Sequence, residues 1–331
     1  MSEHSAETDR HRPSPRRRAD YAPVGTDRRT GLFATVKRTL TEFSEDNLSD
    51  WAAALTYYGL LSIFPALIAL VSIVGLVGDP ASTTKTITDI VTKIGPSSAA
   101  ETFAGPIRSI TSNRSAAGLL LIAGIATALW SASGYIGAFM RAANVIYETP
   151  EGRPIWKLRP LQLLVTLAMV IMLALVALAL VMTGPIVNAV AGPLGIGSTA
   201  VSIWNIAKWP VLLIVMVLMF AVLYYAAPNV KLRSFKFVTP GVVLAIVVWL
   251  IASAAFAFYV ANFGSYDKTY GTLGGFVCLL VWFWITNVAL LLGMELNAER
   301  ERNRELAADV TGADREIQLQ PRDEPKPQKT T

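Results

Sequence analysis

Long stretches without a charged residue constrain this chain more than any other feature of its sequence. The first lies between Asp50 and Asp79 and holds 28 uncharged residues, and the stretch between Lys236 and Asp267 holds 30. A helix needs about 20 apolar residues to cross the hydrocarbon core of a bilayer. Stretches of this length therefore predict membrane-spanning helices rather than the buried helices of a soluble domain.

The pattern as a whole predicts an all-α integral membrane protein. We expect a bundle of six transmembrane helices with a kinked first span and short amphipathic surface helices. The composition agrees, because 53% of the 331 residues are hydrophobic and only 16% are charged, against about 25% charged in an average soluble domain. The expected spans cover about residues 51–77, 116–140, 161–182, 208–227, 238–260 and 272–294.

Polar tails flank the expected membrane domain, residues 31–300. Residues 1–30 hold seven arginines, three prolines and no apolar core, which predicts a disordered basic tail rather than a signal peptide. Residues 301–331 read as a charged helical extension that passes into a disordered tail from about Thr311.

Two segments next to the spans have apolar residues at helical spacing. Leu32, Phe33, Val36, Leu40 and Phe43 mark an amphipathic helix that either lies on the inner membrane surface or packs against the bundle. A second short helix is expected around residues 87–94, in the connection after the first span.

The basic residues predict the orientation of the spans. If both termini and the second and fourth connections lie on one side, that side holds 23 of the 29 Lys and Arg residues. Cytoplasmic segments are enriched in Lys and Arg. We therefore expect a multi-pass membrane protein with both termini in the cytoplasm.

Several kinds of chemistry have no residues to support them. His4 and His11 are the only histidines and Cys278 is the only cysteine, so we expect no metal site, no disulfide and no catalytic residues. No Gly-Lys dipeptide occurs, which excludes a P-loop, and we expect no cofactor. The basic tail "RPSPRRR" fits membrane anchoring better than specific nucleic-acid binding. Membrane lipids are the expected partners.

The first span carries more polar groups than a membrane anchor needs. Pro65 removes a backbone donor and predicts a kink, and Tyr57, Tyr58 and Ser62 lie on the same helix before it. Unpaired hydroxyls facing lipid are costly, so these side chains predict a groove or cavity between helices. Plain helix packing through small residues is the alternative interpretation.

Four further residues extend the predicted groove. Ser131 and Ser133 lie in "WSASGY" of the second span, and Tyr266 and Tyr270 lie in "ANFGSYDKTYGTLGG" before the last span.

Four blocks of the sequence resemble the YihY/BrkB family of bacterial inner-membrane proteins. They are "AAALTYYGLLSIFPALIALVSIVGLVG", "LWSASGYIGAFMRAANVIYE", "YYAAPNVKLRSFKFVTPG" and "FGSYDKTYGTLGGFVCLLVWFWITNVALLLGMELNAE". They occur in family order and cover about residues 40–300. The resemblance implies a six-helix protein linked to envelope integrity, and in some relatives to virulence or serum resistance. It carries over no catalytic residues, and the family's former label of ribonuclease BN is generally regarded as mistaken.

The sequence thus favours a non-enzymatic membrane protein that binds or transports a lipid-like or amphipathic substrate, a role that has been proposed for some relatives. The alternative is a structural or scaffolding protein of the envelope without transport. A membrane-bound ribonuclease is the least favoured of the three.

Overall fold

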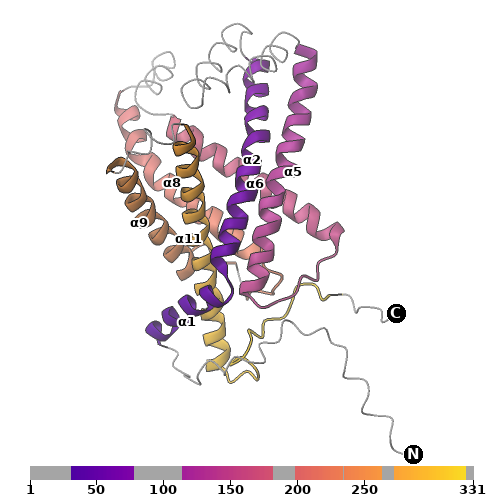
Figure 1. The fold of residues 1–331 in the computed structure, drawn as a ribbon, viewed down its shortest axis with the longest axis vertical. Helices are drawn as coiled ribbons and strands as arrows, with labels where there is room; N and C mark the ends of the chain where they lie inside the picture. Colours follow the sequence, from indigo (N-terminus) through magenta and orange to yellow (C-terminus); the bar gives the residue numbers. More distant parts are fainter. Residues whose placement is uncertain (1–30, 78–113, 182–197, 234, 263–271, 326–331) are drawn as a thin grey trace, which may run out of the picture.

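The computed structural model describes residues 31–77, 114–181, 198–233, 235–262 and 272–325 of the chain. Within these ranges every long regular element is an α-helix and no β-strand is formed, as the sequence predicts. The helices, drawn in Figure 1, are α1 (Leu32–Glu45), α2 (Leu48–Val77), α5 (Arg114–Ile146), α6 (Ile155–Val181), α8 (Ser198–Ala226), α9 (Pro240–Asn262) and α11 (Thr272–Ala307).

Five of the predicted spans are confirmed as helices long and apolar enough to cross a membrane. Among the described residues they are Ile122–Ile146, Ile155–Val176, Val201–Ala226, Pro240–Asn262 and Gly274–Ala307. α2 coincides with the first predicted span, but its side chains from Phe64 onward lie outside the described part. The sixth span and the kink at Pro65 therefore stay predictions, as does the helix around 87–94.

The helices run past the charges that mark the ends of the predicted spans. α8 begins at Ser198 rather than near 208, so Lys208 lies inside the helix, buried, with its Nζ 3.5 Å from Asn205 Oδ1. α5 continues beyond Arg141, and α11 continues beyond Glu295. A charge ends the apolar surface of a helix, but it does not interrupt the backbone hydrogen bonds. A helix can therefore be longer than its apolar span, and the predicted span boundaries stay predictions.

Polar side chains join α2, α5 and α11 inside the bundle. The Tyr135 hydroxyl donates to Asn287 Oδ1 (2.7 Å), and Asn287 Nδ2 donates to Thr56 Oγ1 (3.2 Å). The Thr56 hydroxyl in turn donates to the carbonyl oxygen of Ala52, which is fully buried (2.8 Å). Hydrogen bonds of this kind hold helices together where water is absent.

Two glycines set the packing of α9 on α11. A Cβ atom at Gly241 would overlap the carbonyl oxygen of Gly293, and a Cβ atom at Gly293 would overlap that of Gly241. Close approach also brings the Gly241 N–H to Asn297 Oδ1 (3.0 Å). Small residues permit such backbone contact between membrane helices, and here they place the first turn of α9 beside the second half of α11.

α1 lies at one end of the bundle, beside α11 (Figure 1), and confirms the amphipathic helix expected there. Its buried face is polar, since Thr35, Thr39 and Glu42 are almost fully covered. Its apolar side chains Phe33 and Leu40 are exposed instead. α1 therefore packs on the bundle through its polar face, which leaves the apolar face free for the membrane surface.

Ion pairs hold α1 to α11. Arg38 Nε lies 2.9 Å from Glu299 Oε2. Arg302 sits between three carboxylates, at 3.2 Å from Glu42, 3.1 Å from Glu148 and 3.2 Å from Glu299. Because Arg302 and its partners Glu42 and Glu299 are nearly inaccessible to solvent, each carboxylate depends on the arginines for its compensation.

Residues 308–325 differ from the disordered tail predicted after Thr311. The segment turns back from the end of α11 along the bundle (Figure 1), and the Ile317 side chain is buried. The Ile317 N–H donates to Glu148 Oε2 (2.8 Å), and the Arg322 N–H donates to the Asn229 carbonyl oxygen (2.9 Å). Isolated apolar residues in a polar segment gave no periodic signal, so the sequence did not reveal this contact.

These elements meet in a region that we call the α1 end of the bundle. It holds α1, the connections 147–154 and 227–239, the last turns of α11 and residues 308–325.

Candidate functional site: a basic pocket at the α1 end

Of the three residues predicted to line a groove on α2, Ser62 bonds to a backbone carbonyl, Tyr57 is exposed and Tyr58 packs against α5. Tyr57 is 59% exposed on the surface of α2. Tyr58 is half-buried, with its ring against Gly134 of α5 and the Arg141 guanidinium 5.9 Å from the ring centroid. The Ser62 hydroxyl donates within its own helix, to the Gly59 carbonyl oxygen (2.6 Å).

The predicted residues of the second span behave in the same way. The Ser133 hydroxyl donates to the Trp130 carbonyl oxygen (2.6 Å), and the Ser131 hydroxyl reaches the Leu61 carbonyl oxygen of α2 (3.3 Å). Tyr266, Tyr270 and the Pro65 side chain lie outside the described residues. Among the described residues, the structure brings Tyr58 and Ser131 to the α2–α5 contact, and the groove itself stays a prediction.

A cavity beside α2 is shallow and apolar. Its volume is about 250 Å³, and it opens between α2 and α11 next to Trp284. None of the predicted residues lines it; its lining is Ala53, Thr56, Leu280, Val281 and Trp284.

A larger and more polar cavity lies at the α1 end, between α8, α9 and α11. Its volume is about 440 Å³, within the range of small-molecule sites. We call it the basic pocket. Its lining is Tyr147, Ala221, Tyr224, Tyr225, Leu232, Arg233, Lys236, Val238, Thr239, Pro240, Val242, Asn297, Arg300, Glu301 and Arg304.

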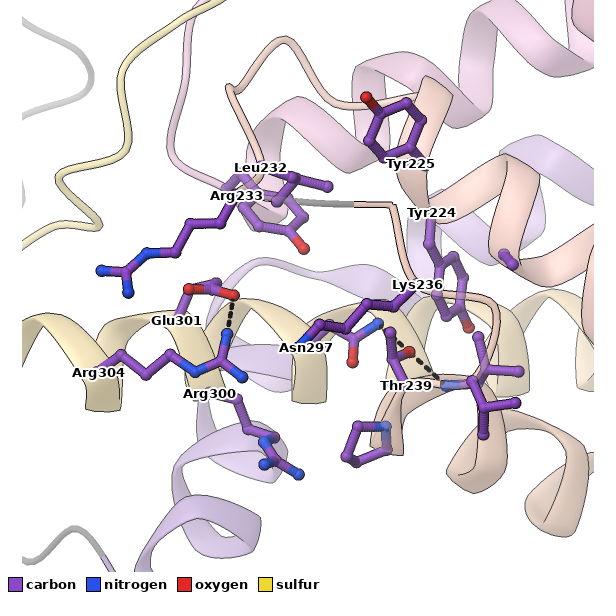
Figure 2. A pocket seen from close by; sticks show the side chains of 15 residues that line it. Tyr224, Tyr225, Leu232, Arg233, Lys236, Thr239, Asn297, Arg300, Glu301 and Arg304 are labelled. Atoms are coloured by element: carbon purple, nitrogen blue, oxygen red, sulfur yellow. Dashed lines mark hydrogen bonds and ion pairs between the residues drawn. The ribbon is translucent and has the colours of Figure 1, made fainter.

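Cationic side chains dominate the polar wall of the basic pocket. Arg233 and Lys236 come from the connection after α8, and Arg300 and Arg304 come from the last turns of α11. Glu301 is the one carboxylate in the lining, and it pairs with Arg304. Figure 2 shows Arg233 and Arg304 on the same side of α11 as Glu301, with Lys236 reaching across that helix near Asn297. The wall thus has a positive excess that suits an anionic group.

The floor of the pocket is held by hydrogen bonds. Asn297 Nδ2 donates to Thr239 Oγ1 (2.9 Å), while its Oδ1 accepts from the Gly241 N–H (3.0 Å). The Thr239 hydroxyl oxygen also accepts from the Val242 N–H at the start of α9 (3.2 Å), the pattern of a helix N-cap. The buried Tyr224 hydroxyl donates to the Leu290 carbonyl oxygen (2.7 Å). These bonds fix the floor, so a ligand would meet a preformed surface.

The rim of the pocket is apolar. Phe237 and Val238 are 58% and 63% exposed, and Val238 also lines the pocket. Phe235 packs edge-on against Tyr225 and Phe237, with ring centroids 5.1 Å and 4.8 Å apart. Tyr225 has a polar hydroxyl, and aromatic side chains of this kind favour the boundary between lipid and water. The pocket therefore places cations next to a surface that suits acyl chains.

Two arginines satisfy the carbonyl groups at the end of α8, next to the pocket. Arg153 Nη2 donates to the Ala227 carbonyl oxygen (2.9 Å), and Arg322 Nη2 donates to that of Tyr225 (2.6 Å). The Arg322 guanidinium also lies 4.8 Å from the centroid of the Tyr225 ring. Cations at a helix C-terminus are stabilising. Arg322, in residues 308–325, thereby holds Tyr225, whose side chain lines the basic pocket.

The carboxylate of Glu151 orients Arg153. Burial alone raises the pKa of Glu151, but hydrogen bonds from Arg153 and Asn144 outweigh it and lower the pKa below its ordinary value. Glu151 therefore stays ionised at neutral pH and holds Arg153 through bonds of 2.6 Å and 2.7 Å.

The sequence contained a signal for the basic pocket that the groove hypothesis did not use. In "KLRSFKF" (231–237) basic and aromatic residues alternate within one short connection, and basic residues recur at 300, 302 and 304 on α11. These residues served only to predict orientation. Their convergence depends on the close packing of α9 on α11, which spacing alone does not reveal.

The described residues hold no group of three or more His, Cys, Asp or Glu side chains placed to bind a metal ion. The chemistry that the basic pocket offers is recognition of charge and apolar surface.

Comparisons with known proteins place the chain in a family. The sequence profile described as "Virulence factor BrkB" matches residues 39–317. The ribonuclease-like protein YfkH of Bacillus subtilis is 36% identical over 256 residues, which are 77% of this chain and 90% of YfkH. A UPF0761 membrane protein of Kangiella koreensis is 28% identical over 80% of this chain and 62% of its own length.

Other relatives match over shorter stretches. A UPF0761 membrane protein of Pseudoalteromonas translucida is 35% identical over 79 residues, 24% of this chain and 26% of that protein. No solved structure gives a significant match. The profile runs from the second half of α1 through α11 to residue 317, and the resemblance in the sequence blocks is confirmed. The chain therefore belongs to the virulence factor BrkB family of membrane proteins.

Proposed function

We propose that this protein is a non-enzymatic membrane protein that binds an anionic, lipid-like molecule in the basic pocket. One observation carries the proposal: a cavity of about 440 Å³ has four cationic side chains in its wall and an exposed apolar rim. An anionic head group would meet Arg233, Lys236 and Arg300, and its acyl chains would leave past Phe237 and Val238. An amphiphile satisfies both surfaces at once.

The free charges favour a phosphate or carboxylate over a neutral head group. Glu301 compensates Arg304, so Arg233, Lys236 and Arg300 remain as the cations without a described ion-pair partner in the pocket. Guanidinium groups bind phosphate and carboxylate through paired hydrogen bonds. The preformed floor at Asn297 and Thr239 limits the ordering that binding requires.

Movement of the ligand across the membrane is a further part of the proposal, and it would follow the apolar surface between the helices. The α2–α5 contact is compatible with the alternative of a scaffold and does not separate it from a carrier. Tyr58 packs on Gly134, and the described hydroxyls of Ser62 and Ser133 are satisfied by carbonyls of their own helices. A dry contact of this kind suits a rigid bundle, which a scaffold and a carrier that moves its ligand elsewhere would share.

We place the α1 end, and with it the basic pocket, on the cytoplasmic side of the bacterial inner membrane. The support is the distribution of Lys and Arg, of which 23 of 29 fall on the side of the termini. A reporter that is active only outside the cytoplasm should therefore be inactive when fused after Thr331. Activity of that fusion would contradict the proposed orientation.

Binding of phosphatidic acid tests the function. The double variant Arg233→Gln/Lys236→Gln should bind phosphatidic acid in detergent micelles about tenfold more weakly than the wild type, a loss of about 1.4 kcal/mol. Both side chains are exposed and neither supports the fold, so the loss should not come from unfolding. Fluorescence titration with a labelled lipid measures the affinity.

A charge-matched control separates the pocket from the general positive charge. Lys231→Gln/Arg315→Gln removes two exposed cations of the α1 end that do not line the pocket. This variant should bind as the wild type does. Equal loss in both variants, or equal binding of phosphatidylcholine by the wild type, would contradict the proposed site.

A further inference from the structure

The ion pairs between α1 and α11 leave one buried carboxyl without compensation. Glu295 lies on α11 one turn before Glu299 and is 2% exposed. Its Oε2 is buried and has no hydrogen-bond partner among the described residues, and no ion pair joins it to them. Glu299 Oε1 and Arg302 Nε also lack a well-formed hydrogen bond, but they lie 3.2 Å apart and compensate each other.

The charges around Glu295 make an ionised carboxylate unfavourable. From α1 and the residue that follows it, Glu42 and Asp46 face Glu295, and from α11 Glu299 does so. Among the described residues Arg302 is the one cation that acts on it, and Arg302 already pairs with Glu42, Glu148 and Glu299. The Tyr147 side chain, at the end of α5, also lies within electrostatic range and is neutral.

Glu295 differs from the other buried carboxylates next to it. Glu42 pairs with Arg302, and Glu299 pairs with Arg38 and Arg302, whereas Glu295 pairs with no arginine among the described residues. A buried charge without a partner is strongly disfavoured, and a carboxyl group avoids it by keeping its proton. The described residues offer no group that could hold a metal ion in its place.

We propose that Glu295 is a proton-binding site: in the folded protein at neutral pH it is a neutral carboxylic acid, and its proton allows α1 to dock on α11. Release of the proton places a further negative charge opposite Glu42 and Asp46 and weakens the α1–α11 contact. The proton site therefore links pH to the position of α1, whose exposed apolar face carries Phe33 and Leu40.

Infrared spectroscopy of the full-length protein in lipid nanodiscs tests this directly. The carbonyl band of a protonated carboxylic acid should appear at neutral pH in the wild type and be absent from Glu295→Gln. It should also disappear from the wild type as the pH is raised. The difference between the wild-type and Glu295→Gln spectra at neutral pH could instead show carboxylate bands that are lost in the variant, with no carboxylic-acid band. That result would overturn the proposal.

Thermal unfolding with a matched pair of variants gives an independent readout. Glu295→Gln keeps the shape of the neutral acid and needs no proton, so its Tm at neutral pH should equal or exceed that of the wild type. The folded wild type holds a proton that the unfolded chain releases at lower pH, so its Tm should fall as the pH rises from neutral to alkaline. That fall should be smaller in Glu295→Gln.

Glu299→Gln is the control, because Glu299 is equally buried but pairs with Arg38 and Arg302. It should lower Tm at neutral pH and keep the alkaline fall. If Glu295→Gln destabilises the protein as Glu299→Gln does and keeps the pH dependence of the wild type, Glu295 is ionised and the proposal fails. Glu295→Met, neutral and of similar length, repeats the test should the Gln variant express poorly.

Discussion

Gly293→Ala should destabilise the bundle by about 3 kcal/mol, because overpacking a tight contact forces the backbone apart. The new Cβ would overlap the Gly241 carbonyl oxygen and lie 2.5 Å from the Tyr224 hydroxyl and 2.7 Å from the Ala245 Cβ. Two of these neighbours cannot rotate away. The Tm of the purified protein should fall by roughly 5–10 °C.

Gly275→Ala provides the matched control on the same helix. A Cβ atom at Gly275 meets nothing within 4 Å, and alanine is the better helix former by about 1 kcal/mol. Its Tm should equal or slightly exceed that of the wild type. Similar Tm values for the two variants would mean that α9 and α11 do not pack through their glycines.

Arg302→Met should cost about 3–5 kcal/mol, because it removes the cation that compensates buried carboxylates. Glu42 lies 3.2 Å and Glu148 3.1 Å from the guanidinium. Methionine is of similar length and fills the space, so the effect reports on charge rather than on a cavity. Limited proteolysis should also show earlier cleavage at α1, since Glu42 would lose its ion-pair partner on α11.

Arg315→Met is the comparison, since Arg315 is exposed in residues 308–325. Its free energy of unfolding should stay within about 0.5 kcal/mol of the wild-type value. If Arg302→Met is as stable as Arg315→Met, the ion pairs of Arg302 do not stabilise the packing of α1 on α11.

Apolar length made the helices predictable, but charges do not mark where a helix ends. The stretch between Lys236 and Asp267 becomes α9, as expected from its length. Lys208 instead lies inside α8, because a charged side chain does not interrupt the backbone hydrogen bonds of a helix. Its side chain is buried there. Sequence periodicity detects which surface is apolar, and it carries little information on where the backbone hydrogen bonds stop.

The candidate site was not predictable because it depends on contacts between distant segments. Ser62 and Ser133 suggested a polar groove, but a serine in a helix can bond to a carbonyl of its own turn, and both do so. Arg233 and Arg300 are 67 residues apart, and they line one cavity in a structure where Gly241 and Gly293 bring α9 onto α11. No local pattern records that approach.

The same limit explains α1. Its apolar residues predicted the helix correctly, yet the polar face is the one that packs, because Arg38 and Glu42 find partners on α11. Amphipathicity predicts two faces, and the partner available to each decides which one is buried.

Photocrosslinking in native membranes tests the central claim, that the basic pocket binds an anionic amphiphile, most directly. A photoreactive phenylalanine analogue at Val238, which is exposed and lines the pocket, should capture mainly anionic lipids. The same group at Val243, exposed on α9 but outside the pocket, should capture lipids in their membrane proportions. Mass spectrometry of the adducts reads the result. Enrichment of anionic lipid at Val238 alone is predicted, and identical lipid profiles at the two positions would contradict the account.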